Sequence, residues 1–304
     1  MSQQGRRQRP QPTLLIRRKT DQPSRKRRRR NGSCSAEPVV QLQRGSDING
    51  IVRQRRWKKV FSAGHPPEHG VAGFVADVRD LSSLQTAIDA AAAHFGRIDI
   101  VVANAGIDTV APMATLEPAS FERVIDINLT GVWRTFKAAL PHVQKRHGYL
   151  LAISSMAAFV HSPLQGSYTA SKAGVWAMCD SIRLELRSLG VGVGSAHPTF
   201  FKTPLMNHVH KDPAGQELWG DNVKGVWKMV PLQEVVMGIA DGIERRSAKI
   251  VVPKSLLITA NAPGVFRRVI ERIGFRDSSI QKAAALASPI GWNDDREAAR
   301  SIGR

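Results

Sequence analysis

Two side chains in this sequence, Tyr168 and Lys172, have the types and the spacing for proton-transfer chemistry. Because they are four residues apart, they share one face of any helix that contains both. A phenol ordinarily ionises near pH ~10, and a nearby ammonium group favours the phenolate and lowers that pKa. The pair therefore predicts a tyrosine that acts as a general acid or base and a lysine that tunes it. The spacing is common by chance, so the surrounding residues must decide.

Ser155 and Asn128 are two polar residues that fit the same site. Ser155 follows the apolar run 149–154, so its hydroxyl is expected at the carboxyl edge of a sheet, within reach of a substrate carbonyl. A loop or cap serine is the alternative. Asn128 lies on an apolar stripe, so its amide is expected to face inward, where it needs hydrogen-bond partners. Those partners are either backbone groups or a water that relays protons to Lys172.

The elements that must position these residues are short apolar runs that alternate with helical patterns from about residue 71 onward. Strands are expected at 71–78, 98–103, 149–154, 191–197 and 250–253. Helices are expected at 82–95, 119–146, 167–189 and 232–245. This alternation is typical of an α/β fold with a doubly wound parallel sheet. Residues 200–230 interrupt it, either as a lid over the substrate or as a surface loop with its own small core around Trp219 and Trp227.

Five short motifs occur in order along this part of the chain. They are Ala76-Asp77-Val78, Ala103-Asn104-Ala105-Gly106, Asn128 within Asn-Leu-Thr-Gly, Ser155, and the Tyr168–Lys172 pair. With these motifs, residues 71–253 closely resemble the classical short-chain dehydrogenase/reductase (SDR) family. The resemblance implies a Rossmann-like fold and an NAD(P)-dependent oxidoreductase. Such an enzyme transfers hydride between NAD or NADP and an alcohol/carbonyl substrate.

The resemblance also implies a role for each matching residue. Tyr168 would be the catalytic acid/base, and Ser155 would orient and polarise the substrate carbonyl. Lys172 would lower the tyrosine pKa and bind the nicotinamide ribose, while Asn128 would anchor the relay water. Thr203 would contact the cofactor's carboxamide or phosphates, although Pro198-Thr199 stands where the family usually has Pro-Gly. The full cofactor-binding set implied is Asp77, Val78, Asn104, Ala105, Gly106, Tyr168, Lys172 and Thr203.

The start of the chain departs from the family pattern. The family has a Thr-Gly-x-x-x-Gly-x-Gly turn that binds the cofactor's pyrophosphate at a helix N-terminus, and no glycine before residue 71 has that spacing. The first β-α-β unit is therefore unrecognisable, NAD and NADP cannot be told apart, and the apolar pieces at 14–16 and 39–40 are too short to predict strands. We expect three segments: a disordered or misassigned (frame-shifted) leader at 1–65, an SDR-type domain at 66–260, and a C-terminal helix with a polar tail at 261–304.

The positive charge is concentrated in this leader. Residues 1–60 hold 18 of the 44 Lys and Arg but 3 of the 25 Asp and Glu, so the net charge of +19 does not indicate a nucleic-acid-binding domain. The rival to a misassigned start is a genuine basic tail for nucleic acid, nuclear import or organelle targeting. A catalytically impaired SDR-like protein with a basic interaction tail is the alternative function.

The remaining features concern partners and compartment. Residues 256–273 mix apolar side chains with arginines, which predicts an amphipathic helix. That helix packs on the domain or a partner subunit, or else covers a hydrophobic substrate or lies on a membrane surface. No apolar run approaches the ~20 residues of a transmembrane helix. Two cysteines indicate a reducing, cytoplasmic compartment, and nine histidines without ligand spacing predict no metal. Small residues on the Tyr168 helix would allow the close packing of a homo-oligomer: Ala170, Ala173 and Gly174.

Overall fold

The computed structural model describes residues 13–18, 38–43, 71–223 and 225–287 of the 304-residue chain. The chain forms two compact units. Unit 1 comprises Met1–Ala105, Gly131–Leu150 and Ser188–Val191, and unit 2 comprises Gly106–Thr130, Leu151–Arg187 and Gly192–Arg304. The residues expected to carry the chemistry, Asn128, Ser155, Tyr168 and Lys172, all belong to unit 2.

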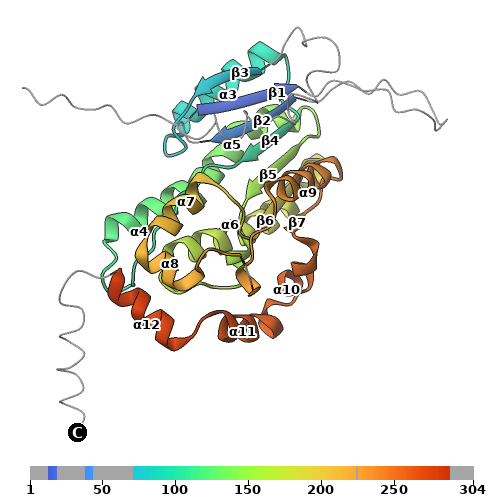
Figure 1. Cartoon of the computed structure of the whole chain (residues 1–304). Coiled ribbons are helices and arrows are strands. Elements are labelled where there is room, and N and C mark those ends of the chain that lie inside the picture. The colour runs from blue at the N-terminus through green and yellow to red at the C-terminus, as the bar shows by residue number, and fades with distance from the viewer. Residues whose placement is uncertain (1–12, 19–37, 44–70, 224, 288–304) are drawn as a thin grey trace, which may run out of the picture. The chain divides into compact units, whose positions relative to one another are not determined.

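Unit 1 contains four strands in the order β3 (Val71–Val75), β1 (Thr13–Arg18), β2 (Pro38–Gln43) and β4 (Ile100–Ala103) (Figure 1). β2 runs parallel to β4, whereas β1 runs antiparallel to both β2 and β3. The expectation that residues 1–65 form no regular structure is therefore wrong at 13–18 and 38–43. Short apolar pieces are weak signals alone, and pairing on both sides decides their structure. The rest of that segment, with the hypothesis of a misassigned start, lies outside the described residues.

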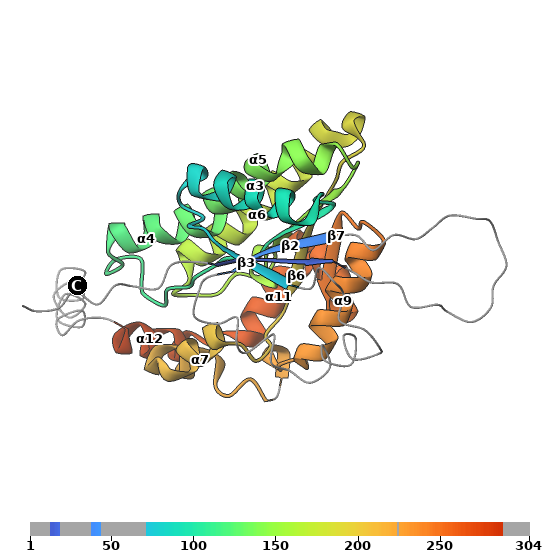
Figure 2. The ribbon, with the colours of Figure 1, turned by 90° about the horizontal axis from the view of Figure 1, so that it is seen from above.

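Two helices pack on one face of these strands (Figure 2). The first, α3 (Leu81–Phe95), begins where the Asp80 carboxylate accepts a hydrogen bond from the Ser82 amide, and it ends at Gly96 with a φ of 75°. The second, α5 (Gly131–Gln144), buries an apolar face against β4. All four residues of β4 are buried, as a central parallel strand requires.

Unit 2 contains the last residues of β5 (Tyr149–Ile153) together with β6 (Gly192–Pro198) and β7 (Lys249–Val252). β6 and β7 are parallel. Helix α6 (Gly166–Leu186) packs against β6 and helix α9 (Leu232–Glu244) against β7, on opposite sides of the strands (Figure 2). The α/β class is confirmed, and the observed elements begin and end within a few residues of the predicted ones.

The helix predicted at 119–146 is interrupted. It consists of α4 (Pro118–Ile125), a π-helical stretch at Asp126–Thr130, and α5. A π-helical stretch inserts an extra residue into the helix and often marks a functional site. Asn128 lies in the middle of this stretch, which therefore sets the direction of its amide. The spacing of apolar residues in the sequence does not reveal such a π-helical stretch.

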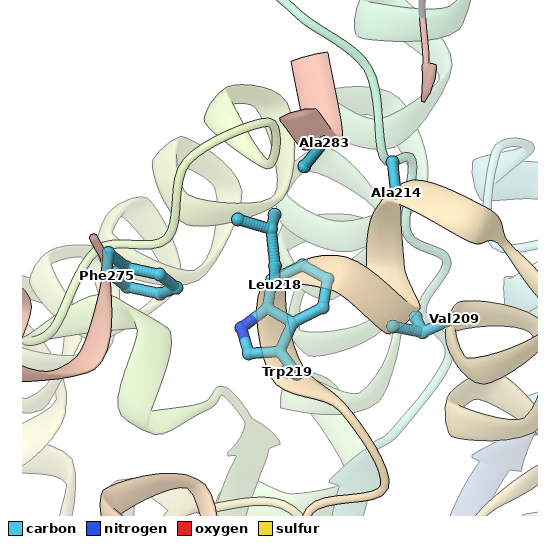
Figure 3. Packing of buried hydrophobic residues seen from close by; sticks show 6 residues of the cluster. All are labelled: Val209, Ala214, Leu218, Trp219, Phe275 and Ala283. Carbon is cyan, nitrogen blue, oxygen red and sulfur yellow. The ribbon is translucent and has the colours of Figure 1, made fainter. Parts of the chain in front are cut away.

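Residues 200–230 form α7 (Pro204–Lys211), α8 (Pro213–Trp219) and a short 3-10 helix (Gly225–Trp227). Three further helices follow β7: α10 (Leu257–Asn261), α11 (Pro263–Gly274) and α12 (Asp277–Leu286). α8 and α12 pack together around a small apolar core (Figure 3) that comprises Val209, Ala214, Leu218, Trp219, Phe275 and Ala283. The predicted small core is therefore present, and the lid function stays a prediction. Among the described residues, no helix combines the length and apolar character needed to cross a membrane.

Candidate active site

The end of β5 and the start of α6 bring Ser155 and Tyr168 together. The amide of Ser154 donates to the carbonyl of Ala196, a 2.8 Å hydrogen bond that fastens the end of β5 to β6. Gln165 occupies the N-cap position of α6, so Tyr168 falls in the first turn of that helix. The Ser155 hydroxyl hydrogen-bonds the Tyr168 phenol. Two groups predicted to act on the same substrate oxygen are thus in direct contact.

Lys172 lies one turn further along α6 and is 5% exposed. Its Nζ donates to the Ile153 carbonyl at 2.9 Å and lies 5.5 Å from the centroid of the Tyr168 ring. The Ser154 hydroxyl donates to the Lys172 carbonyl at 2.8 Å, which joins the backbone of α6 to the strand end. Burial lowers the pKa of Lys172 to about 8, and the Asp108 charge opposes that shift. The side chain therefore stays mostly protonated at neutral pH.

The pKa of Tyr168 is shifted in the direction opposite to our prediction. Burial raises it, because the phenolate loses its hydration, and the negative charge of Asp108 raises it further. The hydrogen bond from Ser155 works in the other direction. The prediction took account of the Lys172 ammonium, which favours the phenolate. It took no account of burial of the phenol, which is the largest influence on the pKa of Tyr168.

Asn128 has the backbone partners that we considered as the structural alternative. It is fully buried, and its Oδ1 accepts from the Ile107 amide at 2.8 Å. Its Nδ2 donates to the Ile107 carbonyl at 2.9 Å and to the Ser171 hydroxyl at 3.0 Å. These bonds hold the loop after β4 against α6. The proton-relay water remains a prediction from the family resemblance.

Two functional candidates escaped the sequence analysis, Asp108 and Gln165. Asp108 lies in the loop after β4, and its Oδ2 accepts a hydrogen bond from the Gln165 side chain. Burial raises the pKa of Asp108 to about 7, against the hydrogen bonds from Thr109 and Gln165 and the charge of Lys172. A signal was present, since Asp108 follows the Asn104–Gly106 motif by two residues and Gln165 precedes Tyr168 by three.

His197 is a third unpredicted member, fully buried in β6. Its Nδ1 lies 3.2 Å from the Ser155 carbonyl and its Nε2 lies 2.8 Å from the Ser195 hydroxyl. Because a carbonyl only accepts, Nδ1 carries the proton and Nε2 accepts from Ser195. Burial lowers the pKa of His197 to about 4, so the ring is neutral at pH 7 and holds the backbone of Ser155.

The cofactor-binding residues that the family resemblance implies occur in both units. In unit 2, a Cβ added to Gly106 would lie 3.4 Å from Asn128 Oδ1 and 3.5 Å from Lys172 Nζ. Glycine therefore leaves backbone accessible next to the ammonium, which has two N–H groups besides the one bonded to Ile153. This arrangement fits the nicotinamide end of a dinucleotide. Thr203 caps α7 by accepting from the Met206 amide at 3.1 Å, so its cofactor contact stays a prediction.

The other implied cofactor residues belong to unit 1: Asp77, Val78, Asn104 and Ala105. The Asp77 carboxylate accepts from the backbone amide of Arg79 at 2.9 Å and forms an ion pair with its guanidinium. Its predicted contact with adenine would have to compete with that ion pair. Among the described residues, no group of three or more His, Cys, Asp or Glu side chains could hold a metal ion.

Comparison with known families supports the resemblance seen in the motifs. The model of the family described as short chain dehydrogenase matches residues 51–214, which is more than half of the chain. The match includes Asn128, Ser155, Tyr168 and Lys172.

Individual relatives and structures agree with that match. (-)-trans-Carveol dehydrogenase of Rhodococcus erythropolis is 42% identical over 136 residues, 44% of this chain and 49% of that protein. Cis-4-hydroxycyclohexanecarboxylate dehydrogenase of Sinomonas cyclohexanicum is 39% identical over 132 residues, 43% of this chain and 53% of that protein. The chain thus spans about half the length of the curated relatives it matches.

Two solved structures share the fold. A short chain dehydrogenase/reductase from Burkholderia phymatum in complex with NAD superposes with a TM-score of 0.56 and 20% identity, over 66% of this chain and 77% of that one. A gluconate 5-dehydrogenase from Burkholderia cenocepacia in complex with NADP and tartrate gives a TM-score of 0.53 and 24% identity, over 60% and 73%. At these identities the likeness supports the fold alone.

Proposed function

Because the chain belongs to the short-chain dehydrogenase/reductase family, we propose that it is an NAD(P)-dependent oxidoreductase acting on an alcohol/carbonyl pair. The observation that carries this proposal is the cluster at the start of α6. Ser155 hydrogen-bonds Tyr168, and Lys172 lies beside the same ring. A proton donor and acceptor, a second hydroxyl and a buried ammonium together suit proton transfer at a substrate oxygen.

Each residue of the cluster would have a separate role in the reaction. The nicotinamide cofactor supplies or accepts the hydride when bound. Tyr168 gives a proton to the oxygen of a carbonyl substrate, or takes one from an alcohol. Ser155 donates a hydrogen bond to the same oxygen and keeps it within reach of the phenol. Lys172 provides a fixed positive charge beside the phenolate that forms and hydrogen-bond donors for ribose hydroxyls.

The names of the relatives suggest a substrate class. Two of them are named for the oxidation of ring-borne hydroxyl groups, in carveol and in cis-4-hydroxycyclohexanecarboxylate. In this chain Val110, two residues after Asp108, and Leu164, directly before Gln165, pack against the apolar core formed with α7, α8 and α12. We therefore infer an alicyclic secondary alcohol, or the matching ketone, with the apolar ring on the side of that core.

A direct test is dinucleotide binding by the full chain, measured by titration calorimetry with NAD, NADH, NADP and NADPH. Binding of one pair is expected, and it should be abolished by Gly106→Val, because that side chain would fill the space beside Lys172 Nζ. Gly264→Val is the matched control, since a Cβ at Gly264 meets no atom within 4 Å. Failure of the wild-type chain to bind any of the four would contradict the proposal. The impaired relative with a basic interaction tail would then be the better description.

Assembly and compartment complete the proposal. The close approach at Gly174 is to Leu129 of the same chain, since a Cβ added to this glycine would lie 3.0 Å from that side chain. Gly174 therefore makes room for Leu129 of its own chain. We infer that the homo-oligomer or peripheral membrane contact instead uses the exposed apolar residues of α11, whose side chains include Val265 and Ile273. Light scattering and vesicle sedimentation separate these two partners. The cytoplasmic compartment remains a prediction from the two cysteines, of which Cys179 is free and buried.

A further inference from the structure

Helix α11 is attached to unit 2 by its polar side. The Glu271 carboxylate accepts a hydrogen bond from the His161 amide at 2.9 Å, and the Arg267 guanidinium lies 3.7 Å from the same oxygen. At the end of the helix, Trp227 Nε1 donates to the Gly274 carbonyl at 3.0 Å. A Cβ added to Gly274 would collide with the Trp227 ring, so the two elements are in close contact.

The opposite side of α11 is apolar and exposed. Val265, Val269 and Ile273 follow one another at intervals of four residues, so they form one stripe along the helix. Helix α10, which packs against α11, exposes Leu257 and Ile258 as well. A surface helix ordinarily buries its apolar stripe and exposes its polar side, and α11 has the reverse arrangement.

The exposed charges beside this stripe are all basic. Arg268 and Arg272 lie one turn apart on α11 and are both exposed. The one acidic residue in the stretch 254–276 is Glu271, which is half-buried and bonded as described, and the next exposed acid is Asp277 at the start of α12. The exposed charged side chains of this stretch are Lys254, Arg268, Arg272 and Arg276.

We propose that the exposed side chains of residues 254–276, here called the α11 surface, dock on a membrane that contains anionic lipid. The apolar stripe would enter the boundary between headgroups and acyl chains, and the arginines would bind headgroup phosphates. None of the described helices can cross a membrane, so the contact lies along the bilayer surface. Figure 1 shows α11 at the edge of unit 2, between α10 and α12.

Charge complementarity favours anionic lipid over the other candidate partners. A symmetric contact with a second copy would bring each α11 surface against its own equivalent, so its four cations would face four more with no exposed acid among them. Nucleic acid would neutralise the arginines, but it would leave the apolar stripe in water. An anionic bilayer surface accommodates both kinds of side chain.

Sedimentation of the full chain with vesicles tests the proposal. The chain should bind vesicles of phosphatidylcholine and phosphatidylglycerol at least about 10-fold more tightly than vesicles of phosphatidylcholine alone. The basic segment 1–60 can also bind anionic lipid, so the variants leave it unchanged and alter the α11 surface only.

The apolar stripe is tested by Val269→Asp, with Leu184→Asp on α6 as the matched control. The two side chains are 58% and 60% exposed, and both substitutions change the net charge equally. Val269→Asp should weaken binding to the mixed vesicles by about 10-fold or more, because an apolar contact is lost and an anion is added. Leu184→Asp should bind like the parent protein.

The arginines are tested by a second pair of variants, which keeps the proposal falsifiable if Val269→Asp does not fold. Arg268→Gln/Arg272→Gln should weaken binding by about 20-fold, at about fivefold for each arginine. Arg187→Gln/Arg245→Gln removes two other exposed arginines of unit 2 and should leave binding near the parent value.

Three results would overturn the proposal. The first is equal binding of the parent to both kinds of vesicle, or to neither. The second is parent-like binding by Val269→Asp or by Arg268→Gln/Arg272→Gln, which would assign lipid binding to another part of the chain. The third is a lipid-free dimer, seen by light scattering, that Val269→Asp converts to a monomer, which would assign the α11 surface to a second copy. None of these measurements needs a dinucleotide, so they are independent of the proposed enzymatic function.

Discussion

Helices α6 and α11 of unit 2 each reverse the ordinary distribution of side chains. On α6, the polar residues Ser171 and Lys172 are 0% and 5% exposed. On α11, the apolar residues Val265 and Ile273 are 68% and 65% exposed. Buried polar groups and exposed apolar groups both cost free energy, so each pattern needs a reason.

The two helices differ in whether other groups of the chain contact these side chains. The buried polar side chains of Ser171 and Lys172 are bonded within the chain. Ser171 donates to the Tyr168 carbonyl at 2.7 Å and accepts from Asn128, and Lys172 donates to Ile153. Helix α11 has no buried residue, although Trp227 and the amide of His161 bond its polar side. Ser171 and Lys172 of α6 are thus satisfied by their own chain, whereas Val265 and Ile273 of α11 are left exposed.

Replacement of the buried ammonium is expected to have the largest of the four effects that follow. Lys172→Met should reduce kcat/KM for alcohol oxidation on the order of 100-fold, because a preorganised charge and hydrogen-bond donor are lost. Steady-state kinetics measure this, with exposed Lys145→Met as the matched control. A variant with the parent's kcat/KM would show that the polar side chains of α6 are merely structural.

The buried hydroxyl of Ser171 should contribute to stability. Ser171→Ala leaves Asn128 Nδ2 without one of its acceptors, so the free energy of unfolding should fall by about 1–3 kcal/mol. Urea denaturation compares this variant with Ser181→Ala, whose exposed hydroxyl makes a long 3.5 Å contact with Glu185. Equal stability of the two variants would contradict the role of the Ser171–Asn128 bond.

The buried imidazole of His197 should make stability depend on pH. Its pKa is lowered from 6.5 to about 4 in the folded chain, so the unfolded chain binds the proton first as pH falls. The free energy of unfolding should therefore fall as the pH is lowered from 6.5 to 4, with a slope of up to about 1.4 kcal/mol per pH unit. His197→Asn should lose that slope. Asp108, whose pKa is raised, contributes an opposite slope there, so the difference between variant and parent is the quantity to measure.

The smallest effect is expected on α11. Val265→Ser should change the free energy of unfolding by no more than about 0.5 kcal/mol, because the side chain is already exposed. Val175→Ser, fully buried on α6, is the matched comparison and should be strongly destabilising. Light scattering should show weaker self-association for Val265→Ser if a second copy covers this face. A stability loss comparable to that of Val175→Ser would mean that α11 packs within the chain.

Much of this arrangement could be predicted because the relevant signals are local. The apolar runs and helical stripes from residue 71 onward located β3 to β7 and α6, and the family motifs located Ser155, Tyr168 and Lys172. What escaped prediction depends on long-range contacts. Strand β1 acquires its structure from pairing with β2 and β3, and the shift at Tyr168 comes from burial and from Asp108, 60 residues earlier in the chain.

The most direct test of the central claim compares the two tyrosines. Tyr168→Phe and Tyr149→Phe each remove one phenol oxygen, but Tyr149 lies buried inside β5 and outside the predicted chemistry. With an alicyclic secondary alcohol and the dinucleotide that binds, Tyr168→Phe should lower the rate of cofactor reduction by about 100-fold or more, while Tyr149→Phe stays near the parent rate. Equal rates for Tyr168→Phe and the parent protein would contradict the assignment of Tyr168 as the catalytic acid/base.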